Sequence, residues 1–135
     1  MNNELFEKAS KIFYNIAFVK TIGVKLISVE DFSAVAEFKV GEHILNYVGG
    51  LHGGAVAGVM DTIVFFPGKL LPSGLKLTTS GLDVKFFKTS AKDDIITVKA
   101  EIVHFGRRRI NVDAEAFIKE SGKIIARANV DLMTI

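Results

Sequence analysis

The sequence predicts an α+β protein in which an antiparallel sheet of five or six strands wraps around one long central helix. Three observations support this class: an amphipathic segment near the N-terminus, a later segment that is apolar on all sides, and four stretches with strand character after it. With 135 residues, 49 % of them hydrophobic and 24 % charged, the chain has the size and composition of one globular domain, residues 1–135.

The first part of the chain predicts one helix and two strands. Residues 4–18 carry apolar side chains at helical spacing, and Asn3 is their candidate N-cap. Residues 22–30 and 33–40 predict two strands, because apolar and polar residues alternate in the second of them. The polar residues between these two stretches are typical of a hairpin turn.

The central helix is predicted from the segment 54–66, which follows a glycine-containing loop and stops at Pro67. Its residues are apolar around almost the whole circumference, and a helix of this kind is expected to be buried on all sides. The segment therefore predicts a helix wrapped by the sheet, not one lying on a surface.

The remainder of the chain predicts four strands. Residues 120–122, Glu-Ser-Gly, are typical of the turn of a hairpin and separate the last two of them. The four stretches cover residues 78–87, 95–104, 108–119 and 123–134.

Composition excludes several classes of function. A net charge of +2 is too small to indicate a nucleic-acid partner, and the absence of cysteine excludes disulfides and thiolate catalysis. No stretch reaches the roughly 18 apolar residues that a membrane helix needs, and the N-terminus lacks the pattern of a signal peptide. We therefore expect a cytoplasmic protein with no membrane partner. The high mean hydropathy, +0.33, suggests surface buried between subunits or a deep apolar pocket.

Asp61 is the one charged residue within the apolar central segment. An aspartate is almost never fully buried without a partner, and an apolar environment disfavours its charged form and makes it a stronger base. Asp61 is therefore a candidate catalytic group. The alternative is a core aspartate that only binds a neighbouring backbone group.

The residues before the central helix, His52-Gly53-Gly54, place backbone amides at its start. The first N–H groups of a helix have no internal partner and carry the positive end of the helix dipole. Because glycine lets a ligand approach the backbone closely, Gly53 and then Gly54 are candidate donors to an oxyanion. A plain glycine-rich helix start is the alternative.

The spacing of these two features predicts an oligomer. Gly53 and Asp61 are eight residues apart, which on one straight helix is roughly 12 Å along the axis. One carbonyl group cannot contact both. The amide of one chain would then meet the carboxylate of another, most simply across a two-fold axis, and this predicts an obligate homodimer with two equivalent sites.

The segment 46–54, Asn-Tyr-Val-Gly-Gly-Leu-His-Gly-Gly, followed by Asp61 resembles the motif of the hotdog-fold acyl-CoA thioesterases. The most similar group is the phenylacetate-degradation-type branch of the 4-hydroxybenzoyl-CoA thioesterase superfamily. The resemblance extends from about Thr21 to the C-terminus and includes Phe-Gly-Arg-Arg at 105–108 and Ala-Arg-Ala at 126–128. Where the family usually has Arg-Pro near the end of the third strand, this chain has Lys-Thr-Ser at 88–90.

The resemblance implies the hotdog fold and the hydrolysis of an acyl-CoA thioester to a free acid and CoA. Asp61 would act as base or nucleophile, and the Gly53 amide of the partner subunit would bind the oxyanion. CoA is part of the substrate, so no cofactor and no metal are expected. The family also implies dimers that often pair further, here into a homotetramer.

A serine or threonine on the third strand positions the water in this family. The alternation of Leu82, Val84 and Phe86 favours Thr79 for this role, whereas counting back from the residues that end the strand gives Ser80. An ordinary strand hydroxyl remains the alternative for either residue.

Asn46 and His52 are further candidates in the loop before the helix. The amide of Asn46 could orient the water or the thioester, although asparagine in a glycine-rich loop is usually a turn residue. His52 could transfer a proton, but we favour a neutral histidine that binds the loop and holds the amide of Gly53.

Three cations are candidates for substrate binding. Arg107 and Arg108 suit the phosphates of CoA because a guanidinium offers forked donors, and a solvated strand start is the alternative. Lys88, at the end of the third strand, is the third candidate.

Four phenylalanines could line an acyl pocket but are more often core residues; they are Phe65, Phe66, Phe86 and Phe87.

Two other functions compete with hydrolysis. One is a non-catalytic acyl-CoA binding protein, although the short N-terminal segment leaves no room for the DNA-binding part typical of such sensors. The other is a hotdog hydratase or dehydratase acting on enoyl thioesters, a branch that typically has Asn-Pro near its histidine, which this chain lacks.

Overall fold

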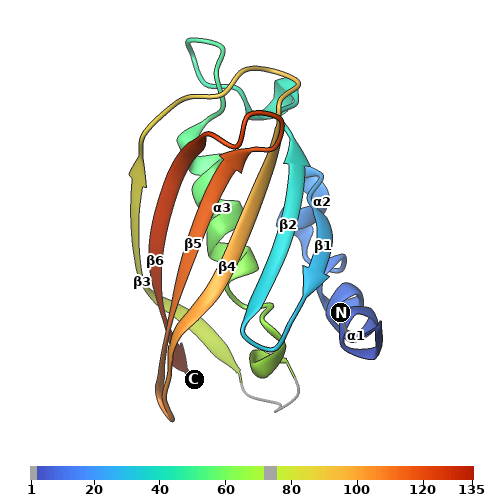
Figure 1. The fold of residues 1–135 in the computed structure, drawn as a ribbon, viewed down its shortest axis with the longest axis vertical. Coiled ribbons are helices and arrows are strands. Elements are labelled where there is room, and N and C mark those ends of the chain that lie inside the picture. Colours follow the sequence, from blue (N-terminus) through green and yellow to red (C-terminus); the bar gives the residue numbers. More distant parts are fainter. Residues whose placement is uncertain (1–2, 72–75) are drawn as a thin grey trace.

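A computed structural model describes residues 3–71 and 76–135 of the chain. Six antiparallel strands form one sheet in the order β1-β2-β4-β5-β6-β3, as Figure 1 shows. This confirms the expected α+β class and the hotdog arrangement of a sheet around a helix. The strands are β1 (Lys25–Val29), β2 (Ser33–Lys39), β3 (Leu77–Phe86), β4 (Ile95–Phe105), β5 (Arg109–Ile118) and β6 (Ile124–Thr134).

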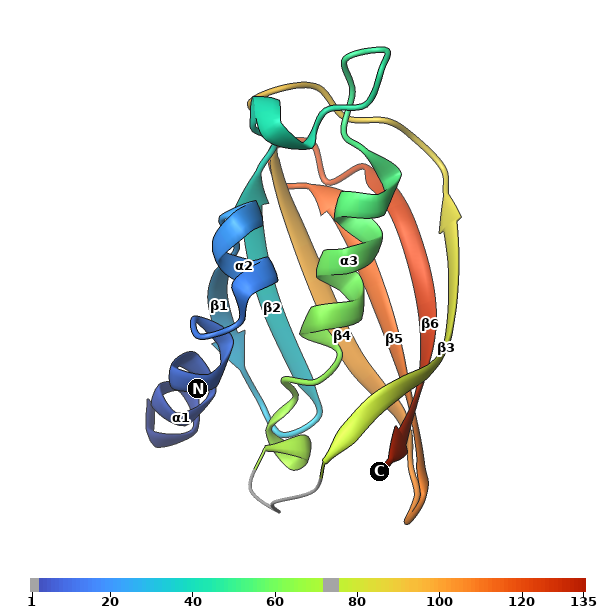
Figure 2. The ribbon, with the colours of Figure 1, turned by 180° about the vertical axis from the view of Figure 1, so that it is seen from behind.

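The central helix α3 (Gly53–Ile63) lies across the inner face of the sheet, with α2 on one side and β3 on the other (Figure 2). Its sheet-facing side chains, such as Val59 and Met60, are completely buried. The opposite side, with Ala57, Gly58 and Asp61, is only half-buried. The expectation that this helix is buried on all sides is therefore wrong for the single chain, because the sheet covers one side only.

The predicted N-terminal helix over residues 4–18 is two helices in the structure, α1 (Asn3–Phe13) and α2 (Ala17–Ile22). Tertiary contacts break it: the Phe13 ring packs edge-on against Phe66, with ring centroids 5.0 Å apart, and the Tyr14 hydroxyl accepts a hydrogen bond from the N–H of Leu26. Because α2 continues to residue 22, the strand predicted from that position begins only at Lys25.

Two short 3-10 helices complete the chain between the strands. They are η1 (Glu42–Ile44) and η2 (Gly68–Leu70). The predicted helix over 54–66 is shorter than expected, since α3 ends at Ile63 and the chain turns before Pro67. Within residues 3–71 and 76–135, no helix is both long and apolar enough to cross a membrane.

One irregularity of the sheet matters for the site. The pairing of β3 with β6 shifts between Thr79 and Gly81, so Ser80 has no partner in the ladder. Thr79 pairs with Leu132, which is completely buried and belongs to the core. The bulge thus determines which hydroxyl of this strand lies next to the inner face.

Candidate active site

Asp61 and Thr79 meet between the central helix and the edge strand. The hydroxyl of Thr79 donates a hydrogen bond of 2.6 Å to Oδ1 of Asp61. Both residues are half-buried, and Asp61 lies on the side of α3 that the sheet leaves open. Its second oxygen, Oδ2, accepts no hydrogen bond from the described part of the chain. The carboxylate is thus oriented by one donor and has one oxygen available for chemistry.

The start of α3 offers one available backbone donor. His52 is the N-cap, and its Nδ1 accepts a hydrogen bond of 2.9 Å from the N–H of Gly54. The N–H groups of Ala55 and Val56 both point to the carbonyl of His52. The N–H of Gly53 has no acceptor among residues 3–71 and 76–135. Of the two expected oxyanion donors, the N–H of Gly53 is therefore the available one. His52 binds the N–H of Gly54, and not that of Gly53 as expected.

Asn46 fixes the loop that precedes the helix. Its Oδ1 accepts hydrogen bonds from the N–H of Val48 at 3.1 Å and of Gly50 at 3.0 Å. Its Nδ2 donates to the carbonyl of Leu51 at 3.4 Å, and Gly49 adopts the left-handed conformation, with φ of +87°. These bonds correspond to the turn role that was the alternative for Asn46.

A cavity of about 370 Å³ lies at the start of α3 and brings three of the predicted residues together: Asn46, Gly53 and Lys88. The ring of Phe86 forms a wall beside Gly53, where an added Cβ would lie 3.3 Å from its Cζ atom. This close approach requires glycine or a shift of the ring. The remaining lining residues are Leu51, Val56, Phe87, Thr89, Ser90 and Ile125.

Asp61 does not line this cavity. It lies eight residues after Gly53 on the same 11-residue helix, which corresponds to roughly 12 Å along the axis. A carbonyl group bound to the N–H of Gly53 cannot simultaneously contact the carboxylate of the same chain.

Other predicted residues lie elsewhere. The hydroxyl of Ser80 donates to the carbonyl of Asp131 at 3.2 Å and does not face Asp61. Arg107 and Arg108 are exposed in the turn between β4 and β5, away from the cavity at Gly53. Among the phenylalanines, Phe66 is a core residue, Phe65 is half-buried, and Phe86 and Phe87 border the cavity.

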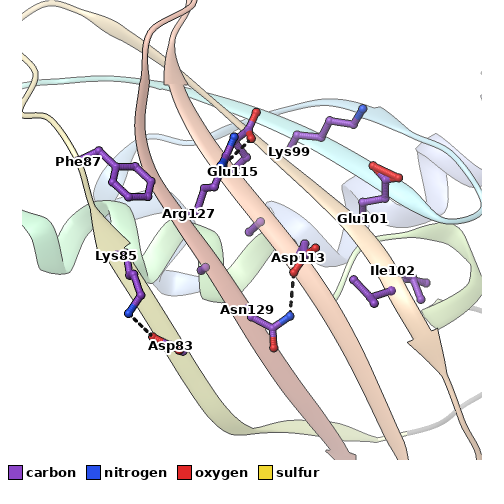
Figure 3. Close-up of a pocket in the computed structure, with 13 residues that line it drawn as sticks. Asp83, Lys85, Phe87, Lys99, Glu101, Ile102, Asp113, Glu115, Arg127 and Asn129 are labelled. Carbon is purple, nitrogen blue, oxygen red and sulfur yellow. Dashed lines mark hydrogen bonds and ion pairs between the residues drawn. The ribbon is translucent and has the colours of Figure 1, made fainter.

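A second cavity, of about 790 Å³, lies on the outer face of the sheet (Figure 3), and of the candidate site and pocket residues predicted from the sequence it contains Phe87 alone. Several of its charged side chains have a polar partner within the cavity. Arg127 pairs with Glu115 at 3.1 Å, and Asn129 donates to Asp113 at 2.8 Å. The predicted residues Asp61 and Gly53 lie instead on α3, which packs against the other face of the sheet.

Thr89 and Ser90 line the inner cavity and were not predicted as site residues. These two residues lie against the loop that precedes α3. The N–H of Leu51 donates to the carbonyl of Ser90, and a Cβ at Gly50 would lie 2.4 Å from Oγ1 of Thr89. The glycine at position 50 is the sequence signal for this close approach. Its partner segment, however, is distant in sequence.

Comparison with known families identifies the class of protein to which the chain belongs. The sequence model of the thioesterase superfamily matches residues 48–125, which include Gly53, Asp61 and Thr79. The chain belongs to the thioesterase superfamily, and its expected class of enzyme, a thioester hydrolase, is confirmed.

The relatives extend the match over nearly the whole chain. The acyl-coenzyme A thioesterase PaaI of Escherichia coli K12 is 25% identical over 126 residues, which cover 93% of this chain and 88% of PaaI. The solved structure of Escherichia coli PaaI superposes with a TM-score of 0.88 at 24% identity, covering 97% of this chain and 93% of that one. These matches confirm the resemblance to the phenylacetate-degradation type.

A thioesterase protein from Streptococcus pneumoniae TIGR4, solved with coenzyme A, is a further structural relative. It is 28% identical with a TM-score of 0.75, and the match covers 82% of this chain and 87% of that chain.

Proposed function

We propose that the protein hydrolyses acyl-CoA thioesters to a free acid and CoA, with Asp61 as the reacting carboxylate. The observation that carries this proposal is the hydrogen bond from Thr79 to Asp61 on the open side of α3. Two relatives support the choice of substrate, since PaaI is named an acyl-coenzyme A thioesterase and the Streptococcus pneumoniae protein was solved with coenzyme A.

The chemistry follows from the available groups. As a general base, Oδ2 of Asp61 takes a proton from a water molecule whose oxygen attacks the thioester carbon. The N–H of Gly53 stabilises the oxyanion, and collapse of the tetrahedral intermediate expels the CoA thiolate, which takes up the proton. As a nucleophile, Asp61 instead attacks the carbon directly, and the C–S bond breaks to release the CoA thiolate and leave an anhydride. Water then hydrolyses the anhydride to the free acid and the Asp61 carboxylate, and the proton released is taken up by the thiolate.

The site is completed by a second copy of the chain. Because Gly53 and Asp61 are roughly 12 Å apart on one helix, we assign the oxyanion donor to the partner subunit of a homodimer. β3 is an edge of the sheet, and its side chains Leu82 and Phe86 are 44% and 53% exposed on the side that faces α3. An edge strand with exposed apolar side chains is a favourable surface for a partner.

Hydrolysis is tested by incubating the protein with a panel of acyl-CoAs and measuring free CoA with a thiol reagent. We expect Asp61→Asn to lower kcat between about 10²- and 10⁴-fold while acyl-CoA binding is retained. Asp83→Asn is the matched control, because Asp83 lies on the outer face and forms an ion pair with Lys85. If no acyl-CoA releases CoA but the ligands raise the melting temperature, the protein is a binding protein.

The shared site is tested by complementation between two inactive variants. In Gly53→Pro the oxyanion donor is removed, and in Asp61→Asn the reacting carboxylate is removed. A mixed dimer has one site with both defects and one intact site, so co-expression in equal amounts should restore about a quarter of the wild-type activity. A site formed within one chain would show no restoration.

A further inference from the structure

The ring of Phe18 packs directly on the backbone of α3 at Gly58. A Cβ built at Gly58 would lie 2.4 Å from Cζ of this ring, with two further ring atoms at 3.0 and 3.2 Å. Only a residue without a side chain allows this contact. The ring belongs to α2, which lies beside α3 opposite β3 (Figure 2).

The contact lies close to the reacting carboxylate. Gly58 precedes Asp61 by three residues, and residues at this spacing are neighbours on one helix face, about 5–6 Å apart at Cβ. Both belong to the side of α3 that the sheet leaves open. Thr79 contacts Asp61 from β3, whereas Phe18 covers the helix from α2. The space beside the carboxylate thus has a polar side and an aromatic side.

The Phe18 ring is carried by a helix that is anchored at its end, although the ring itself is accessible. Its neighbour Val19 and the last residue of α2, Ile22, are buried, and Gly23 closes the helix in the left-handed conformation. The carbonyl of Ile22 also lies 3.2 Å from Nε2 of His43. Yet Phe18 is 37% exposed, so part of its apolar surface is accessible beside Gly58.

We propose that Phe18, seated on Gly58, is the wall that limits the size of the acyl group. This inference rests on the proposed hydrolysis at Asp61. An acyl group whose carbonyl carbon is attacked there, and which runs along α3 toward α2, meets the ring within about one helical turn. The wall therefore favours short or compact acyl groups and excludes long chains. Thr62 does not compete for the substrate, because its hydroxyl already donates to the carbonyl of Gly58 at 2.8 Å.

The test is the dependence of kcat/KM on acyl length, measured with acetyl-, hexanoyl-, decanoyl- and palmitoyl-CoA. We expect Phe18→Ala to raise the ratio of kcat/KM for the long acyl groups over that for the short ones by roughly tenfold or more. Phe18→Leu should give a smaller shift in the same direction. Phe32→Ala is the control, since Phe32 is 50% exposed at a distant turn beside Lys69 and should leave the ratio unchanged.

A second pair of variants tests the contact itself. Gly58→Ala should lower the melting temperature, because its methyl group collides with the ring, and the double variant with Phe18→Ala should recover most of the loss. An unchanged length profile in both Phe18 variants, with wild-type hydrolysis intact, would overturn the proposal for Phe18 alone. Absence of hydrolysis in the wild-type protein would instead overturn the proposed function.

Discussion

The hydroxyl of Thr79 and the carboxylate of Asp61 are joined by a hydrogen bond of 2.6 Å, which links the edge strand β3 to the central helix α3. A hydrogen bond to an ionised group is shorter and stronger than one between neutral groups. It orients the carboxylate, whose other oxygen, Oδ2, has no donor among residues 3–71 and 76–135. The carboxylate is therefore positioned by a strand as well as by its own helix.

Removing the hydroxyl should impair turnover more than folding. We expect Thr79→Val to lower kcat by about tenfold or more, since a hydrogen bond to a charged group contributes about 1.5–3 kcal/mol. Thr79→Ser keeps the donor and should retain most of the activity. Steady-state kinetics with one acyl-CoA checks both, with Ser80→Ala as the control for a hydroxyl on the same strand that does not contact Asp61.

The backbone donor of Gly53 can be tested without removing the helix. Gly53 is the first residue of α3, a position at which proline is tolerated because its missing N–H has no helical partner. Gly53→Pro should lower kcat about 10²- to 10³-fold, the cost of losing one oxyanion donor. Gly53→Ala keeps the N–H but meets the ring of Phe86 at 3.3 Å, so it measures the steric part alone. Equal activity of the two variants would show that the N–H plays no part.

His52 should act on stability through its capping bond to Gly54. We expect His52→Ala to lower the free energy of unfolding by about 1 kcal/mol, because the N–H of Gly54 loses its acceptor. His52→Asn offers a capping oxygen and should recover most of this loss. Urea denaturation measures the difference. A larger effect of His52→Ala on kcat than on stability would instead indicate proton transfer.

Asn46 should act through the loop that it closes. In Asn46→Ala the N–H groups of Val48 and Gly50 lose their shared acceptor, and the loop before Gly53 should open more often. Hydrogen exchange of these two amides should accelerate, with a smaller loss of activity than for Asp61→Asn. Asn46→Asp keeps the accepting oxygens and should preserve their protection. Unchanged exchange in Asn46→Ala would contradict this role.

Most of the fold can be predicted from the sequence, because alternation and helical periodicity are local signals. The strands after α3 agree with the prediction within a few residues, and β5 and β6 flank the predicted turn at 120–122. The break of the N-terminal helix could not be predicted, since it depends on contacts that Phe13 and Tyr14 make with residues distant in sequence. The open side of α3 was not predicted. Apolar residues indicate that a helix surface is buried, but they do not indicate what buries it.

The site was predicted in part. Asp61 stands out because it is charged in an apolar segment, and Gly53 because it starts the helix. A regular strand would place Ser80, not Thr79, on the same face as Leu82. The expectation that alternation favours Thr79 is therefore wrong for a regular strand. The bulge between Thr79 and Gly81 inserts one residue and brings Thr79 to Asp61. The capping of Gly54 depends on the rotamer of His52, which no sequence pattern determines.

The place of Thr79 on an edge strand has a consequence for how the protein can evolve. Within the described chain, the outer side of β3 carries backbone groups with no neighbouring strand, and the same strand orients Asp61. A mutation that distorts this strand will alter both the tendency of chains to associate and the alignment of the carboxylate. Selection for solubility and selection for turnover therefore act on the same ten residues of β3. A substitution there that improves one of these properties will also change the other.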